Sequence, residues 1–110
     1  MNAARPLPDV TASLLGGFSP YLRRVVFDFS TNFIEFQLLD RIEHPVSVRV
    51  LKFDRLRELQ ITPHDSADSD PDFMDSIIGA HRDGDEYHFH TDRFAISFSC
   101  GAFSEYNGNA

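Results

Sequence analysis

Hydrophobic and polar residues alternate along much of this chain, and the alternation starts near Arg23. A repeat of two residues is typical of half-buried β-strands, because successive side chains point to opposite faces of a sheet. The expected strands cover residues 23–30, 33–39, 46–50, 55–61, 86–90 and 93–103. The clearest apolar face lies in the last of them, around Ile96 and Phe98.

Two segments have a less regular pattern. In residues 55–61, Leu56 and Leu59 are three positions apart, whereas Leu59 and Ile61 are two apart. A bulge inside a strand and a short helical turn would both explain this spacing, and we favour the strand. Residues 73–81 fit a helical turn or a strand equally well.

A short helix is expected before the first strand. Asp9 is a suitable capping residue for a helix over residues 10–15, and the glycines that follow, Gly16 and Gly17, supply the left-handed conformation that ends one. The preceding residues 1–8 contain two prolines and are expected to be loose.

The turns between the expected strands indicate the fold class. Most connections are short, and the Asp83-Gly84 step is a strong hairpin signal. Six or seven strands joined in this way predict a mainly β protein with an antiparallel sheet, either barrel-like or two-layered, although an α+β arrangement is not excluded. We expect a single domain over residues 1–110, with a frayed C-terminus at residues 105–110.

Composition supports a folded β domain. The chain has 110 residues, with 11 Phe, 3 Tyr and no Trp, and aromatic side chains favour strands. Cys100 has no disulfide partner and is expected to be a small buried hydrophobe. No apolar stretch reaches the ~18 residues that span a membrane, and the first eight residues lack a secretory signal, so we expect a cytoplasmic protein without membrane contact.

Charge is concentrated in one part of the chain. The net charge is −7, and residues 54–86 hold ten acidic against three basic residues. Nucleic-acid binding requires a basic patch, so a nucleic-acid partner is disfavoured and a basic protein partner is expected.

The acidic segment resembles the opening of a calcium loop without completing it. Asp68, Asp70 and Asp72 alternate as calcium ligands do. Phe73 stands where the loop needs glycine, and Gly79 stands where it needs a bidentate glutamate. We therefore expect no calcium site and no cofactor.

Three histidines form the other candidate metal site. His88 and His90 would project from one face of a strand, with His81 opposite them across the hairpin, and such a set is able to hold zinc. The sequence places no carboxylate to orient the rings, so they are weak metal candidates. We favour exposed histidines that would make a partner interaction sensitive to pH. No nucleophile elbow or phosphate-binding glycine loop is present.

The run from Val25 to Phe103 resembles the small β-rich immunity proteins of bacterial polymorphic toxin systems. The likeness lies in the early alternating strands, in the segment from Ile77 to Asp92, and in the apolar strand from Phe94 to Phe98. The resemblance implies a non-catalytic inhibitor that neutralises a basic toxin domain, in some systems a nuclease, through complementary charge. The expected contact residues are Asp68, Asp70, Asp72, Phe73, Asp75, Asp83, Asp85 and Tyr87, with Phe73 or Tyr87 as the aromatic anchor.

Two alternatives remain open. An accessory or assembly domain would bind a partner by adding a strand at its sheet edge. A small zinc-dependent enzyme would use His81, His88 and His90. The sequence does not decide between a monomer and a homodimer.

Overall fold

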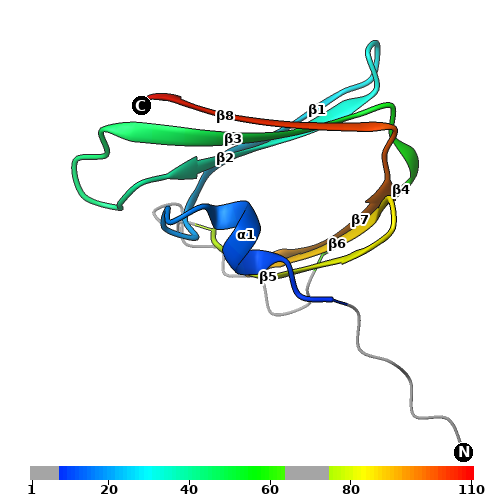
Figure 1. Cartoon of the computed structure of the whole chain (residues 1–110), viewed down its shortest axis with the longest axis horizontal. Coiled ribbons are helices and arrows are strands. Elements are labelled where there is room, and N and C mark those ends of the chain that lie inside the picture. Colours follow the sequence, from blue (N-terminus) through cyan, green and yellow to red (C-terminus); the bar gives the residue numbers. More distant parts are fainter. Residues whose placement is uncertain (1–7, 64–74) are drawn as a thin grey trace, which may run out of the picture.

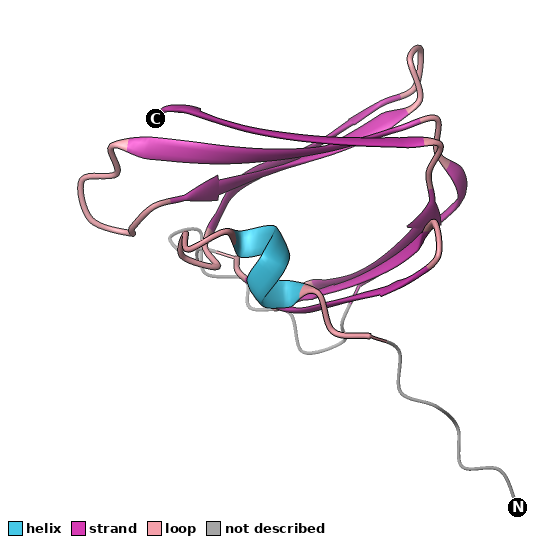
Figure 2. Ribbon diagram, viewed as in Figure 1, coloured by secondary structure: helices cyan, strands magenta, loops and turns pink. Residues whose placement is uncertain are grey.

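The computed structural model describes residues 8–63 and 75–110. These residues form two antiparallel sheets of four strands each and one short helix (Figure 2). The elements are α1 (Thr11–Leu15), β1 (Leu22–Asp28), β2 (Phe33–Leu39), β3 (Ser47–Asp54), β4 (Arg57–Pro63), β5 (Ile77–Asp83), β6 (Glu86–Thr91), β7 (Phe94–Ser99) and β8 (Ala102–Asn109). Sheet 1 has the order β1-β2-β3-β8, and sheet 2 has the order β4-β7-β6-β5. The expected mainly β class is therefore confirmed.

The two sheets face each other and share a bent corner (Figure 1). Two residues connect β3 to β4, and Cys100 and Gly101 connect β7 to β8. The Gly101 N–H donates to the carbonyl oxygens of Asp54 and Arg55 at 3.0 and 3.2 Å. Hydrogen bonding between the two bent ribbons therefore continues around the corner.

A second corner ties the start of β1 to the start of β5. The Leu22 N–H donates to the Asp75 carbonyl oxygen, and the Ile77 N–H donates to the Pro20 carbonyl oxygen, both at 2.9 Å. Beyond these hydrogen bonds β1 and β5 do not pair as strands, so the sheets remain two layers and do not close into a barrel. The helix α1 lies at the opening between β8 and β5 (Figure 1).

Aromatic side chains from both sheets fill the space between the layers. Phe53 of β3 is fully buried and contacts five other rings at centroid distances from 4.7 to 5.9 Å. These rings belong to Phe36, Tyr87, Phe89, Phe98 and Phe103. Most of these contacts are edge-to-face, the geometry that aromatic quadrupoles prefer over a face-to-face sandwich. The high phenylalanine content therefore serves the core.

The helix ends where the sequence predicts but begins one residue later, and its N-cap is Val10, which makes no side-chain capping bond, instead of Asp9. The Thr11 N–H donates to the Asp9 carboxylate at 2.8 Å, and hydrogen bonding by Thr11 lowers the pKa of Asp9. Gly16 ends the helix in the left-handed conformation, with φ of 57°. Within residues 8–63 and 75–110, no helix is long and apolar enough to cross a membrane.

A buried arginine fixes the helix to sheet 1. The guanidinium of Arg49 donates to the Leu14 carbonyl oxygen at 2.8 Å, to the Asn107 side chain at 3.2 Å and to the Glu105 carboxylate at 2.6 Å. Because a buried charge is stable only when it is hydrogen-bonded, this network holds α1, β3 and β8 in one arrangement.

The C-terminal part differs from the sequence prediction. Residues 93–103 were expected to form one strand, but they form β7 and the first residues of β8, so the described chain has eight strands instead of six or seven. The expected frayed tail at residues 105–110 is also wrong for most of its length, because β8 continues to Asn109. It pairs with β3 without a break from Ala102 to Asn109, and this nonlocal pairing orders a polar segment.

The two irregular segments are both strands. The bulge expected in residues 55–61 is confirmed, because the pairing of β4 with β7 shifts between Arg57 and Gln60. Residues 77–83 form β5, so the strand interpretation of that segment is correct. Of the expected loose N-terminus, residues 1–7 lie outside the described residues, and the Pro8 carbonyl oxygen accepts a hydrogen bond from the Arg82 N–H.

Truncating the central ring should destabilise the protein strongly. Phe53→Ala removes a fully buried side chain, and we expect it to lower the free energy of unfolding by about 3 to 5 kcal/mol. Urea unfolding measures this loss. Phe29 is 88% exposed, so Phe29→Ala should change stability by less than about 0.5 kcal/mol. Equal losses in the two variants would contradict the proposed core.

The two adjacent glycines allow a test of the Arg49 network. Both have positive φ, 57° at Gly16 and 86° at Gly17, so alanine at either position costs about 1 kcal/mol of backbone strain. Only at Gly16 would the added Cβ lie 2.7 Å from Arg49 Cζ, whereas at Gly17 it would meet nothing within 4 Å. Gly16→Ala should therefore have the lower melting temperature, and identical melting temperatures would argue against the network.

Candidate functional site

Four of the expected partner-binding residues lie outside the described residues. They are Asp68, Asp70, Asp72 and Phe73. The structure describes the other four, which are Asp75, Asp83, Asp85 and Tyr87.

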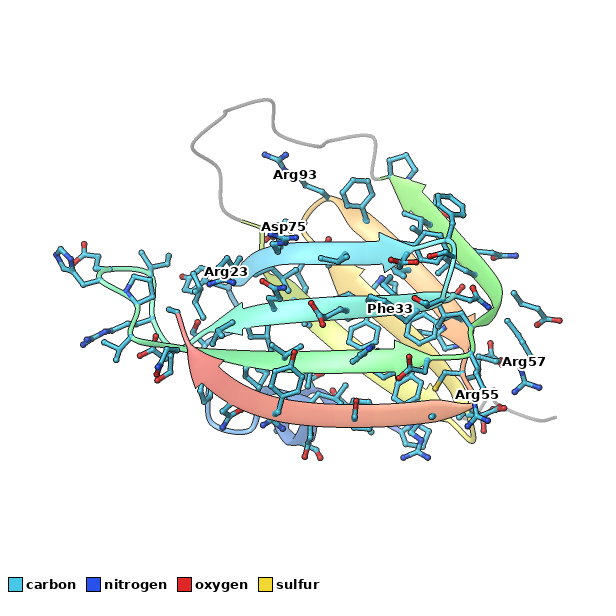
Figure 3. All side chains as sticks on the ribbon, turned by 90° about the horizontal axis from the view of Figure 1, so that it is seen from above. Arg23, Phe33, Arg55, Arg57, Asp75 and Arg93 are labelled. Carbon is cyan, nitrogen blue, oxygen red and sulfur yellow. The ribbon has the colours of Figure 1, made fainter. Side chains whose placement is uncertain are left out.

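Asp75 is bound within the protein at the corner between β1 and β5. Its carboxylate accepts hydrogen bonds from the Asp92 N–H at 2.9 Å and from the Thr91 hydroxyl at 3.0 Å. Asp92 in turn accepts hydrogen bonds from the Ser76 N–H at 3.0 Å and from the Ser76 hydroxyl at 2.6 Å. This network joins the start of β5 to the β6–β7 turn, which is a structural role for Asp75. Figure 3 shows Asp75 close to the start of β1.

Asp83 and Asp85 lie at the opposite end of β5. The eight residue steps between Asp75 and Asp83 span about 25 Å in an extended strand. The Asp85 carboxylate is ion-paired with Arg57 of β4, whereas Asp83 is exposed beside the turn. Asp75 therefore does not share one acidic surface with Asp83 and Asp85.

Tyr87 faces the core. It is 3% exposed, and its ring packs 4.7 Å from Phe53 and 5.8 Å from Phe98. Burial raises the pKa of its hydroxyl. Tyr87 therefore presents no ring to a partner in this structure, and its expected neighbours on the strand, His88 and His90, point to the outer face as predicted.

Three histidines meet on the outer face of sheet 2. His81 of β5 is the register partner of His88 on β6, and its ring lies near His90, with centroids 6.4 Å apart. The neighbouring strand β7 contributes the small side chains of Ala95 and Ser97, which together with Gln60, Thr62 and the β6 histidines line a shallow hollow of about 220 Å³. The expected juxtaposition of the histidines is therefore present.

The histidine cluster does not have the arrangement of a metal centre. His88 Nε2 lies 2.9 Å from the Glu86 carboxylate, and this pair is partly exposed. In the described part of the chain, no three His, Cys, Asp or Glu side chains are grouped so that they could hold a metal ion. Sequence reasoning overlooked Glu86, although residues two apart on a strand share a face, as Glu86 and His88 do.

Three of the four sheet edges are protected. The segment before α1 covers β5: the Arg82 N–H donates to the Pro8 carbonyl oxygen, and the Val10 N–H donates to that of Ala80. The edge of β1 carries two exposed arginines beside a bulge, and the edge of β4 has a bulge and ends at Pro63. Charge, bulges, proline and covering segments are the usual means of preventing unwanted strand pairing.

Within the described residues, the edge of β8 has no bulge, no proline and no hydrogen-bonded covering segment, and its one charged side chain, Glu105, is paired with Arg49. The strand is eight residues long, pairs with β3 in unbroken register and contains no proline, lysine or arginine. Within the described residues, no backbone hydrogen bond leaves β8 on its outer edge. Phe103 and Tyr106 on this strand are 38% and 54% exposed. No alternating pattern marks this strand in the sequence, because Phe103 and Tyr106 are three residues apart and point to opposite faces.

The single cysteine is not suited to nucleophilic chemistry. Cys100 is 7% exposed, and burial raises the pKa of its thiol, so the reactive thiolate is disfavoured. The expected role as a small buried hydrophobe is confirmed.

Zinc binding gives a direct test of the histidine cluster. We expect the purified protein, equilibrated with zinc and then desalted, to retain less than one zinc ion per chain, because the cluster lacks a third convergent ligand. Elemental analysis measures the retained metal. Stoichiometric zinc in the wild type that is lost in His90→Ala would reverse this conclusion.

Comparisons with protein-family models, with curated proteins and with solved structures found no match to this chain.

Proposed function

We propose that this chain is a non-catalytic protein-binding module that uses the outer edge of β8 as a contact. The observation that carries the proposal is the unprotected edge of an eight-residue strand beside three protected edges. An extended segment of a partner would satisfy the free N–H and C=O groups of this edge and extend sheet 1.

Side chains on both faces of β8 would add specificity. Tyr106 points to the outer face of sheet 1, where it is the register partner of Val50, and Phe103 points to the inner face opposite Phe53. An added strand would place its own side chains beside these two rings, and aromatic residues are frequent anchors of protein interfaces.

The edge is already ordered in the free protein. Arg49 binds the inward-facing side chains of Glu105 and Asn107, and β3 pairs with every residue from Ala102 to Asn109. A rigid edge loses little conformational entropy when a partner binds, which favours affinity.

Toxin neutralisation is the form of this function that the immunity-protein resemblance supports. The negative net charge of −7 would attract a basic toxin domain, and the exposed carboxylate of Asp83 is available for such a contact. Asp75 and Asp85 already have partners within the chain, so charge would serve mainly association and the β8 edge would supply affinity.

The competing form is an assembly domain. A second copy of β8 is the simplest partner for a free edge, because two such strands can pair across a two-fold axis. The two forms differ in the partner and share the contact surface.

The first experiment compares edge variants with a matched control. Ser104→Lys places a charge on the exposed edge strand, and Thr62→Lys places the same charge on β4, which is also exposed. We expect affinity for a co-purifying protein to fall about tenfold or more in Ser104→Lys and in Tyr106→Ala, and to be unchanged in Thr62→Lys. Isothermal titration with the purified partner measures this difference.

Sedimentation velocity and salt dependence separate the forms. A homodimer that Ser104→Lys dissociates identifies the assembly form, whereas a monomer that captures a basic toxin domain identifies the inhibitor. Equal affinity of all variants for the partner would contradict binding at the β8 edge. So would an affinity that is lost at high salt but is unchanged by Tyr106→Ala.

A further inference from the structure

A shallow cavity lies where the β1–β2 turn meets the corner between β3 and β4. It has a volume of about 460 Å³. Its lining residues are Thr31, Asn32, Arg55, Leu56, Arg57 and Gly101, and we call it the arginine basin. Two hydrogen bonds join its walls: the Asn32 side-chain amide donates to the Leu56 carbonyl oxygen at 2.7 Å, and the Leu56 N–H donates to the Asn32 carbonyl oxygen at 3.2 Å.

The backbone around the basin is strained. Asn32, Arg55 and Glu58 have φ of 55°, 54° and 55°, in the left-handed region that side chains other than glycine seldom adopt. Asparagine tolerates this conformation well, but arginine and glutamate do so at a cost of stability. Such costly conformations concentrate at binding sites, where the surrounding structure holds them.

The strained corner directs two guanidinium groups toward the same end of the molecule (Figure 3). Arg55 donates to the Gly101 carbonyl oxygen at 2.9 Å, and Arg57 is ion-paired with Asp85. Gly101 leaves room for the first of them, because a Cβ at this position would lie 2.8 Å from Arg55 Nε.

The basin is a positive site in an acidic protein. No carboxylate is among its lining residues, and in the described part of the chain the Asp85 side chain is the one carboxylate that pairs with Arg55 or Arg57. Apart from its bond to Gly101, the Arg55 fork has no protein acceptor among these residues. Arg55 is exposed, and among the described residues no carboxylate neutralises its charge.

We propose that the arginine basin binds the oxyanion of a small organic ligand, either a carboxylate or a phosphate ester. Guanidinium groups match both anions through paired hydrogen bonds. The buried Leu56 provides an apolar floor for the organic part. The volume lies within the usual range of small-molecule sites. This inference does not depend on the β8 contact.

Two probes that differ only in the anion identify the ligand class. Phenyl phosphate and benzoate share an aromatic ring that suits the apolar floor. In a titration of the ¹⁵N-labelled full chain, we expect saturable shifts of the Thr31 and Gly101 amides. Tighter binding of phenyl phosphate assigns the site to phosphate esters, and equal or tighter binding of benzoate assigns it to carboxylates.

Arginine variants test where the probes bind. We expect Arg55→Gln and Arg57→Gln each to weaken binding about tenfold, the loss typical of one charge-assisted hydrogen bond. Arg57 has a 62% exposed side chain, so its variant should fold even if Arg55→Gln does not.

Arg41 provides the matched control. Its side chain is 59% exposed, donates to the His44 carbonyl oxygen at 3.1 Å and lies 3.9 Å from the Asp40 carboxylate, so it resembles the basin arginines in each contact. Arg41→Gln should bind both probes as the wild type does. The proposal is overturned if neither probe gives saturable shifts at the basin, or if Arg55→Gln and Arg57→Gln bind as tightly as the control.

Discussion

The packing of Phe53 against rings from both sheets is the interaction on which the rest of this structure depends. Phe53 lies on β3, one residue before the bend that carries the chain toward sheet 2, and its partners come from β2, β6, β7 and β8. The two layers can share this core only if the chain bends sharply between them. The bend in turn decides where the exposed surfaces lie.

Both surfaces that we propose for binding lie next to the corner beside this core. Gly101 carries the hydrogen bonding from one ribbon to the other, and its lack of a side chain leaves space for Arg55. The arginine basin, which includes Asn32 and Arg55 with left-handed backbone conformation, lies at this corner, and β8 begins directly after Gly101. The polar network of Arg49 then fixes the far part of β8 and the helix.

Protection of the other edges gives the β8 edge its significance. A free strand edge can pair nonspecifically with another chain. In this chain, charged residues, bulges, a proline or a covering segment hinder such pairing at β1, β4 and β5. On β8 there is no bulge, proline or basic residue, and the charge of Glu105 is paired with Arg49. Uneven protection of this kind is expected where one edge has a partner and the others must remain single. The acidic character of the protein would then affect how fast a basic partner arrives more than how long it stays.

Local pattern was sufficient for much of the fold. The alternation in residues 33–39, the bulge near Glu58 and the glycine that ends the helix are all consequences of neighbouring side chains and backbone angles, so the sequence alone predicted them. The outward direction of His88 follows from the same period of two residues. The core role of Phe53 was not predicted, because the strand expected there ended at Val50, whereas β3 continues to Asp54.

Only the tertiary structure decided the features that join distant segments. The polar segment 105–109 becomes a strand because β3 supplies its hydrogen bonds, and no local pattern records that pairing. Asp75 and Asp83 are close in sequence and both acidic, but an extended strand separates them and the first is bound internally. The sequence did not predict a site at Arg55 and Arg57, because charge counts along a chain do not show which carboxylates lie near a given arginine. Hydrophobic alternation is a local pattern, so it can be read from neighbouring residues. Sheet edges, ion pairs and cavities depend on which distant strands lie next to one another in the folded chain.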